Sequence, residues 1–169
     1  MSRTADALAR ARAEGRIALM PFIVAGHPSP AATPGLIRTL FESGADVVEL
    51  GVPFSDPLAD GATNQRANEV ALRQGMTLAR CLGMVRDVRS SGVEGAIALM
   101  GYYNPMLAYG LDRFVPDAAA AGVDGLIVVD LPPEESDDLR EQCRASGLDL
   151  IYLLAPTSSD GRIALVAKR

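Results

Sequence analysis

The sequence has little of the side-chain chemistry that hydrolytic triads and metal sites use. Its 169 residues include no tryptophan, one histidine and two cysteines. A Ser-His-Asp triad would depend on His27, a loop residue before Pro28, and no nucleophile elbow is present. His, Asp and Glu residues do not cluster with ligand spacing, so we expect no metal site. Cys81 and Cys143 fall within helical patterns and are expected to be buried thiols.

Other absences narrow the class of protein. The chain has no apolar run of about 18 residues, the length that spans a membrane. Its first residues lack the apolar core of a signal peptide, so we expect a cytoplasmic protein. The net charge of −5 argues against a nucleic-acid partner, because phosphate binding needs a basic face. No glycine-rich dinucleotide fingerprint follows the first expected strand, where Gly26 stands alone.

The chain does contain a repeated unit: a helix end, a glycine, an aliphatic residue, an acid and a short apolar run. The four copies are Ser43-Gly44-Ala45-Asp46, Ser91-Gly92-Val93-Glu94, Ala121-Gly122-Val123-Asp124 and Ser146-Gly147-Leu148-Asp149. They predict strands at 47–50, 96–100, 125–129 and 150–154, after a first helix at 3–14 and a first strand at 17–24. Segments with helical spacing separate these strands. We expect Gly44 in a left-handed conformation, and N-caps at Thr77, Asp112 and Ser158.

Alternating strands and helices with continuously apolar strands predict a parallel sheet covered by helices. Two layouts remain: an open doubly wound sheet, or a (βα)₈ TIM barrel. Chemically interesting residues follow the second, third and fourth strands, which favours the barrel. We find about five βα units, and the last stops inside its helix at 158–169. Residues 1–169 are therefore expected to form a single domain that is an incomplete barrel.

The stretch from Glu49 to Gly61 carries the strongest candidate chemistry. Glu49 ends an apolar strand, and its side chain should share a face with Val47, opposite Val48 and Leu50. An apolar surround would raise its pKa and suit it to proton transfer. The alternative is a carboxylate satisfied by nearby backbone N–H groups or a serine.

Two further acids have structural alternatives. Asp60 would put a second carboxylate in the same pocket, or it caps a helix that begins near Ala62. Asp130 follows the fourth strand and reads as a turn or interface residue rather than a catalytic group. Among aromatic residues, Phe22 and Tyr102, with Tyr103, can line a pocket for a flat apolar ligand, or Phe22 simply packs in the core.

The segment ELGVPFSDPLADG at 49–61 resembles the hallmark segment of the tryptophan synthase alpha chain family. Further segments resemble the family in the same order: Pro21-Phe22-Ile23, Ser43-Gly44-Ala45-Asp46, Leu99 to Pro105, Gly122 to Glu135 and Leu153 to Thr157. The resemblance covers essentially the whole chain, as the N-terminal two-thirds of a family member. It implies a (βα)₈ barrel.

The resemblance also implies a reaction, the retro-aldol cleavage of indole-3-glycerol phosphate to indole and glyceraldehyde 3-phosphate in tryptophan biosynthesis. By position, Glu49 matches the catalytic acid/base. Asp60 matches the residue that holds the indole N–H. Phe22, Met100 and Tyr102 match positions that line the indole pocket.

A partner follows from the same resemblance. It implies a beta chain, in an alpha2beta2 complex, that holds pyridoxal phosphate, while the alpha chain needs no cofactor. The face that meets the beta chain resembles the positions Pro53, Asp56, Pro57, Asn104 and Pro105.

This chain departs from the family in two ways. It has Asn64 where an aliphatic residue is usual, which puts a polar group beside the expected indole pocket. The family's glycine- and serine-rich phosphate loops follow later strands, so residues 1–169 alone are expected to be inactive. The alternatives are another phosphate-handling barrel, such as an isomerase or epimerase, and an inactive remnant that only docks a beta chain.

Overall fold

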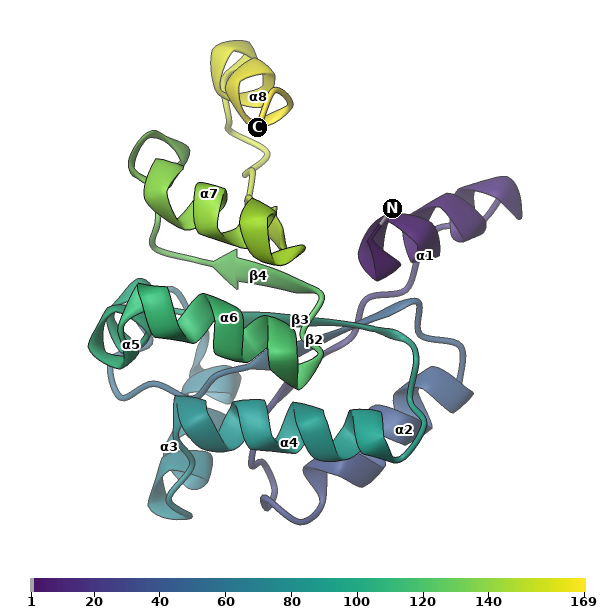
Figure 1. Ribbon diagram of the computed structural model, residues 1–169, viewed down its shortest axis with the longest axis vertical. Coiled ribbons are helices and arrows are strands. Elements are labelled where there is room, and N and C mark those ends of the chain that lie inside the picture. The colour runs from purple at the N-terminus through teal and green to yellow at the C-terminus, as the bar shows by residue number, and fades with distance from the viewer. Residues whose placement is uncertain (1) are drawn as a thin grey trace.

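A computed structural model describes residues 2–169, and its centre is a parallel sheet (Figure 1). The strands are β1 (Phe22–Val24), β2 (Val47–Gly51), β3 (Ala96–Gly101), β4 (Gly125–Val128) and β5 (Asp149–Ile151). The helices are α1 (Arg3–Ala13), α2 (Thr33–Glu42), α3 (Ala62–Arg73), α4 (Leu78–Ser90), α5 (Tyr103–Tyr109), α6 (Leu111–Ala121), α7 (Asp137–Ser146) and α8 (Asp160–Val166), with a 3-10 turn η1 (Pro133–Glu135).

The order of strands in the sheet decides between the two expected layouts. Neighbouring strands are also consecutive in the chain, β1-β2-β3-β4-β5, and every pair is parallel. A doubly wound sheet would reverse this order at a switch point. The sequential order is that of successive (βα) barrel units, so the prediction of about five such units is confirmed.

The two faces of the sheet pack against different partners. Val48, Leu50, Ile97 and Leu99 face the larger apolar core, which α2, α3, α4, α6 and α7 complete. These helices lie in succession over one side of the sheet, with α2 against α4, α4 against α6 and α6 against α7 (Figure 1). Val47, Ala96, Ala98 and Ile127 form a smaller cluster on the opposite, inner face with Ala7 of α1. The strand alternation predicted for β2 is thus confirmed.

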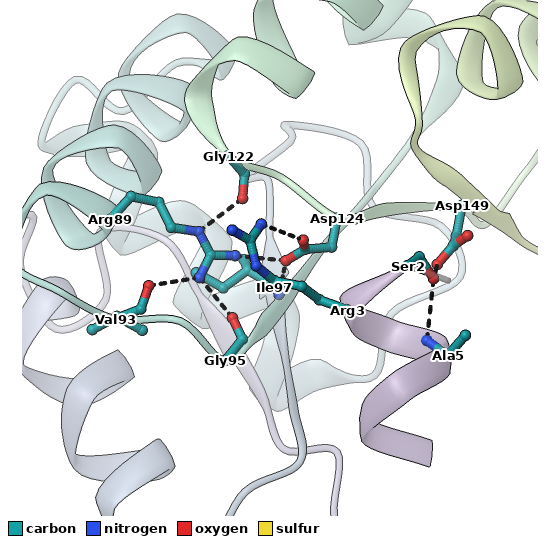
Figure 2. Close-up of polar contacts among 10 residues, drawn as sticks. All are labelled: Ser2, Arg3, Ala5, Arg89, Val93, Gly95, Ile97, Gly122, Asp124 and Asp149. Atoms are coloured by element: carbon teal, nitrogen blue, oxygen red, sulfur yellow. Dashed lines mark hydrogen bonds and ion pairs between the residues drawn. The ribbon is translucent and has the colours of Figure 1, made fainter. Parts of the chain in front are cut away.

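The repeated acid lies where the strands begin, at the amino edge of the sheet. The buried Asp124 carboxylate accepts hydrogen bonds from Arg3 Nη1 at 3.0 Å, Arg89 Nη2 at 2.5 Å and the Ile97 N–H at 2.8 Å. Figure 2 shows the Arg89 guanidinium at the centre of this cluster. It also donates to the backbone carbonyls of Gly122, Val93 and Gly95.

Two other copies of the acid hold the N-terminal segment in the same way. Asp46 accepts two hydrogen bonds from the Arg16 guanidinium and one from the Leu19 N–H. The Arg16 hydrogen bonds, helped by Leu19, lower the pKa of Asp46 to about 2. Asp149 accepts a hydrogen bond from Ser2 Oγ at 2.5 Å (Figure 2). Together with Arg3, these contacts attach α1 and its following loop to the amino edge.

Several predicted boundaries are wrong. The first strand is 22–24 rather than 17–24, and Ile17 is 93% exposed. The last strand is 149–151 rather than 150–154. Asp112 is a first-turn residue of α6, whose N-cap is Gly110, and α8 is capped by Ser159 rather than Ser158. The Thr77 N-cap and the left-handed Gly44, at φ 98°, are confirmed.

Candidate active site

Glu49 lies in the middle of β2, and the neighbouring strands fix its direction. Its register partners are Phe22 on β1 and Ala98 on β3. Side chains at matched positions of parallel strands point to the same face. Ala98 belongs to the inner-face cluster, so Glu49 points inward as well. The sequence-based prediction of its face is confirmed.

The environment of Glu49 suits proton transfer. The side chain is half-buried, and burial raises its pKa above the ordinary value of 4.5. Desolvation is the whole cause, since no cation or hydrogen-bond donor within residues 2–169 offsets it. Within residues 2–169 no backbone N–H or serine donates to this carboxylate, so the described part of the chain gives the alternative reading no support. A carboxyl with a raised pKa exchanges its proton more readily near neutral pH.

A small pocket at the carboxyl edge of the sheet brings together four predicted site residues. Phe22, Asp60, Met100 and Tyr102 all line it. The other lining residues are Gly51, Val52, Asn68, Gly101 and Val129. The free space is about 10 Å³, which is room for about one water molecule. Glu49 does not line this pocket itself, but its register partner Phe22 does.

A glycine allows the Phe22 ring to lie where it does. A Cβ placed on Gly51 would come within 2.6 Å of the Phe22 ring atom Cζ. Any larger residue at position 51 would therefore push the ring out of its place. Sequence reasoning missed this role, because nothing in the residues around Gly51 shows that a ring crosses it.

Asp60 reaches the pocket from the loop between β2 and α3. Its Oδ2 accepts a hydrogen bond from Asn68 Nδ2 at 3.1 Å. The neighbouring Ala59 N–H donates to the Tyr102 hydroxyl at 2.9 Å. Asp60 does not cap α3, whose N-cap is Gly61, so the capping alternative is wrong. The loop thus carries an acid that is fixed by groups on two other elements.

Asn68 is a site residue that sequence reasoning missed. Its side chain is only 4% exposed, within the buried face of α3 that includes Ala67 and Ala71. A polar side chain on a buried helix face needs hydrogen-bond partners. That position, on a face otherwise made of alanines, is the signal that would have found it.

Asp130 is in the turn that follows β4. Its Oδ1 accepts a hydrogen bond from the Tyr103 N–H, the first residue of α5, at 2.8 Å. It does not line the small pocket. The turn interpretation is therefore confirmed, and the carboxylate also fixes the start of α5.

The five residues expected at a partner face differ in exposure. Asp56 and Asn104 are exposed, and Pro57 and Pro105 are partly exposed. Pro53 is buried, so its side chain is not presented to a partner. The same loop exposes Leu58 at 92%, which sequence reasoning did not single out. The loop tip and the start of α5 thus present both polar and apolar groups.

Several other expectations can be placed. Cys81 and Cys143 are buried and free, and burial raises the pKa of each thiol to about 12.

Asn64 lines a separate, larger groove beside β1, where Phe22 and the exposed His27 also lie. Asn64 does not line the pocket that holds Asp60, but Phe22 lines both, so Asn64 lies beside that pocket as expected. Within residues 2–169 no group of three His, Cys, Asp or Glu side chains is placed to hold a metal ion.

None of the helices within residues 2–169 has the length and apolar character that crossing a membrane requires.

Comparison with known proteins identifies close similarity along the chain. The model of the family described as "Tryptophan synthase alpha chain" matches residues 8–169. The tryptophan synthase alpha chain of Geobacter sulfurreducens is 55% identical over 169 residues, covering 100% of this chain and 64% of that relative. That of Roseiflexus castenholzii is 54% identical over 166 residues, covering 98% of this chain and 64% of the relative.

Solved structures give the same result. Tryptophan synthase subunit alpha from Legionella pneumophila superposes with a TM-score of 0.94 at 44% identity, covering 98% of this chain and 63% of that chain. Tryptophan synthase from M. tuberculosis in its aminoacrylate-bound form gives a TM-score of 0.92 at 39% identity, covering 99% and 68%. The chain spans about 64% of the length of the curated relatives it matches.

Proposed function

Because this chain belongs to the tryptophan synthase alpha chain family, we propose that its gene product is a lyase that cleaves indole-3-glycerol phosphate to indole and glyceraldehyde 3-phosphate. The observation that carries the proposal is a pocket with one acid on its wall and a second acid on the neighbouring strand position. Asp60 lines the pocket and accepts a hydrogen bond from Asn68, while Glu49, the register partner of the pocket residue Phe22, is half-buried with a raised pKa. Retro-aldol cleavage needs both a proton shuttle and a fixed negative charge.

We assign Glu49 as the acid/base. It removes the proton from the glycerol hydroxyl and protonates indole C3, so the carbon–carbon bond breaks as the new carbonyl forms. A carboxyl whose ionised form is destabilised by burial suits both steps. Its inward direction, beside Phe22, supports this role.

Asp60 stabilises the charge that develops on the indole ring. Protonation at C3 gives the ring positive character, and a carboxylate at the ring N–H lowers the energy of that state. Phe22, Met100 and Tyr102 provide the apolar walls. The pocket has room for about one water, so the Phe22 ring or the Asp60 loop must move to admit an indole.

The proposal includes a partner and a compartment. The exposed Asp56 and Asn104, with Pro57 and Pro105, form the face that we assign to a beta chain in an alpha2beta2 complex. That beta chain carries pyridoxal phosphate, and the cleavage step proposed for this chain requires no cofactor. We place this biosynthetic step in the cytoplasm.

Glu49→Gln in the full gene product that contains residues 1–169 tests the function. We expect kcat for indole release to fall by about 10²–10⁴-fold, the usual contribution of a general acid/base. KM should change little, because the amide keeps the shape of the side chain. Steady-state kinetics with indole-3-glycerol phosphate measure both constants.

Glu94→Gln is the matched control, since Glu94 is exposed and precedes β3 at the opposite edge of the sheet. It should keep wild-type kinetics. Absence of indole release by the wild-type protein would reject the proposed function. Near-normal turnover by Glu49→Gln would instead remove Glu49 from the mechanism.

A further inference from the structure

Asn68 makes three hydrogen bonds, and two of them go to the two ends of the loop between β2 and α3. At the start of the loop, the Phe54 N–H donates to Asn68 Oδ1 at 3.4 Å. At its end, Asn68 Nδ2 donates to Asp60 Oδ2 at 3.1 Å. The second amide hydrogen of Nδ2 goes to the Asn64 carbonyl at 3.0 Å. One buried amide on α3 therefore links both ends of the loop to the same helix.

The backbone of Asp60 has hydrogen-bond partners of its own, but the Asp60 carboxylate relies on Asn68. The backbone is held by the Asp60 N–H to the Pro57 carbonyl and by Gln65 Nε2 to the Asp60 carbonyl. The carboxylate itself receives a side-chain hydrogen bond within residues 2–169 from Asn68 alone. Its other oxygen, Oδ1, accepts none there. A single donor thus decides which oxygen stays available in the pocket.

We propose that Asn68 is a positioning residue for the cleavage reaction: it binds Asp60 Oδ2 and leaves Oδ1 to accept the indole N–H. The inference rests on the proposed function, because the orientation of the Asp60 carboxylate matters for catalysis only if Asp60 binds the indole N–H. Asn68 does not act on the reacting atoms. It fixes the rotation of the carboxylate through a hydrogen bond to one of its two oxygens.

Asn68→Asp separates this role from packing. The substitution keeps the shape of the side chain and the Oδ1 acceptor for Phe54. It replaces the Nδ2 donor to Asp60, and to the Asn64 carbonyl, by a second carboxylate oxygen. At pH 8 we expect kcat to fall by about tenfold or more, the effect of losing one hydrogen bond to a charged group. The melting temperature should fall as well, because two carboxylates then face each other.

Lowering the pH should partly restore this variant. Two adjacent carboxylates take up one proton at a raised pKa, and the protonated oxygen again donates a hydrogen bond. The ratio of variant to wild-type kcat should therefore rise between pH 8 and pH 6. The ratio is used because Glu49, whose pKa burial raises, is present in both proteins. Tyr102, the other titratable group lining the pocket, stays neutral because burial raises its pKa further.

Two further variants complete the design. Arg73→Gln lowers the net charge by the same one unit on the same helix, at a side chain that is 75% exposed, and leaves the Asn68–Asp60 and Gln65–Asp60 hydrogen bonds in place. It should keep kcat within about twofold of wild type. The double variant Asn68→Asp with Asp60→Asn reverses donor and acceptor. It should recover part of the melting temperature lost by Asn68→Asp, since the hydrogen bond to the Asn64 carbonyl stays absent. It should remain inactive because the carboxylate has moved.

Each outcome is decisive. The inference is overturned if Asn68→Asp keeps the wild-type kcat or melting temperature at pH 8, if its kcat deficit is the same at every pH, or if the double variant recovers no stability. It is also overturned if Arg73→Gln loses as much activity as Asn68→Asp. A wild-type protein that releases no indole rejects the proposed function instead, while the melting temperatures still test the hydrogen bond.

Discussion

The burial of Glu49 suits it to proton transfer but also lowers the stability of the folded protein. Burial without a donor or cation disfavours its charged form, which raises its pKa. The same burial means that the folded protein binds the Glu49 proton more tightly than the unfolded chain does. The ionised carboxylate therefore lowers the free energy of unfolding at neutral pH.

Glu49→Gln should consequently stabilise the protein above pH 4.5, the ordinary pKa of this group. The gain is largest above the raised folded-state pKa, where wild-type Glu49 is charged, and it disappears as the pH falls below 4.5, where the residue is protonated in both states. Melting temperatures of the two proteins across this pH range measure the effect. A variant that is less stable than wild type at pH 8 would contradict it.

Some of the site was predictable from residue type and position. The face of Glu49 follows from strand alternation, and Phe22, Met100, Tyr102 and Asp60 do line one pocket as the family resemblance implied. Asn68 and Gly51 were not predicted. The first acts through the direction of its amide and the second through the ring that crosses it. The ring comes from another strand, so the residues around Gly51 do not show it, whereas Asn68 could have been found as the polar residue on a buried face of alanines.

Among the elements, the start of β4 is the most strongly held. Asp124 is 6% exposed and is the only carboxylate that Arg89 contacts within residues 2–169, while burial lowers the pKa of Arg89. Removing one partner of a buried ion pair leaves the other charge uncompensated. By contrast, the Arg3 side chain in the same cluster is 54% exposed.

Asp124→Ala is therefore expected to lower the free energy of unfolding by roughly 3 to 5 kcal/mol. Arg3→Ala, the matched control, should cost no more than about 1 kcal/mol, because exposed ion pairs contribute little. Chemical denaturation of both variants makes the comparison. Equal losses would show that Arg3, rather than Arg89, is the important partner of Asp124.

Element types were easier to predict than their ends. Residues 17–21 and 152–154 are apolar like the strands they precede or follow, yet they are not strand. A strand continues only while its neighbour pairs with it, and the last pair between β4 and β5 is Ile127 with Ile151. Composition does not show where a partner strand stops, so both strands were predicted too long.

At the scale of the whole molecule, the five-stranded sheet has two unpaired edges within residues 2–169, one on β1 and one on β5. Exposed apolar side chains lie close in sequence to both edge strands. Ile17 is 93% and Leu19 56% exposed before β1, and Leu153 is 57% exposed after β5. Unpaired backbone groups beside apolar surface favour pairing with another chain.

Residues 1–169 produced alone are therefore expected to self-associate at micromolar concentration. Sedimentation velocity over a dilution series should show species larger than a monomer. Ile17→Lys with Leu153→Lys should shift the distribution toward monomer, whereas Leu8→Lys, on the outer part of α1, should not. A monomer at every concentration would show that the edges are protected.

The contacts of α1 also limit when this helix can dock during protein synthesis. Arg3 and Ser2 emerge from the ribosome well before their partners Asp124 and Asp149, which lie 121 and 147 residues later. At typical translation speeds of about 5–20 residues per second, α1 waits roughly 6 to 30 s for these carboxylates. Its buried face, including Ala7, packs against residues of β2, β3 and β4, so that face is covered only as these strands are made. Nascent chains of this protein therefore expose an early helix to chaperones until strands made much later are in place.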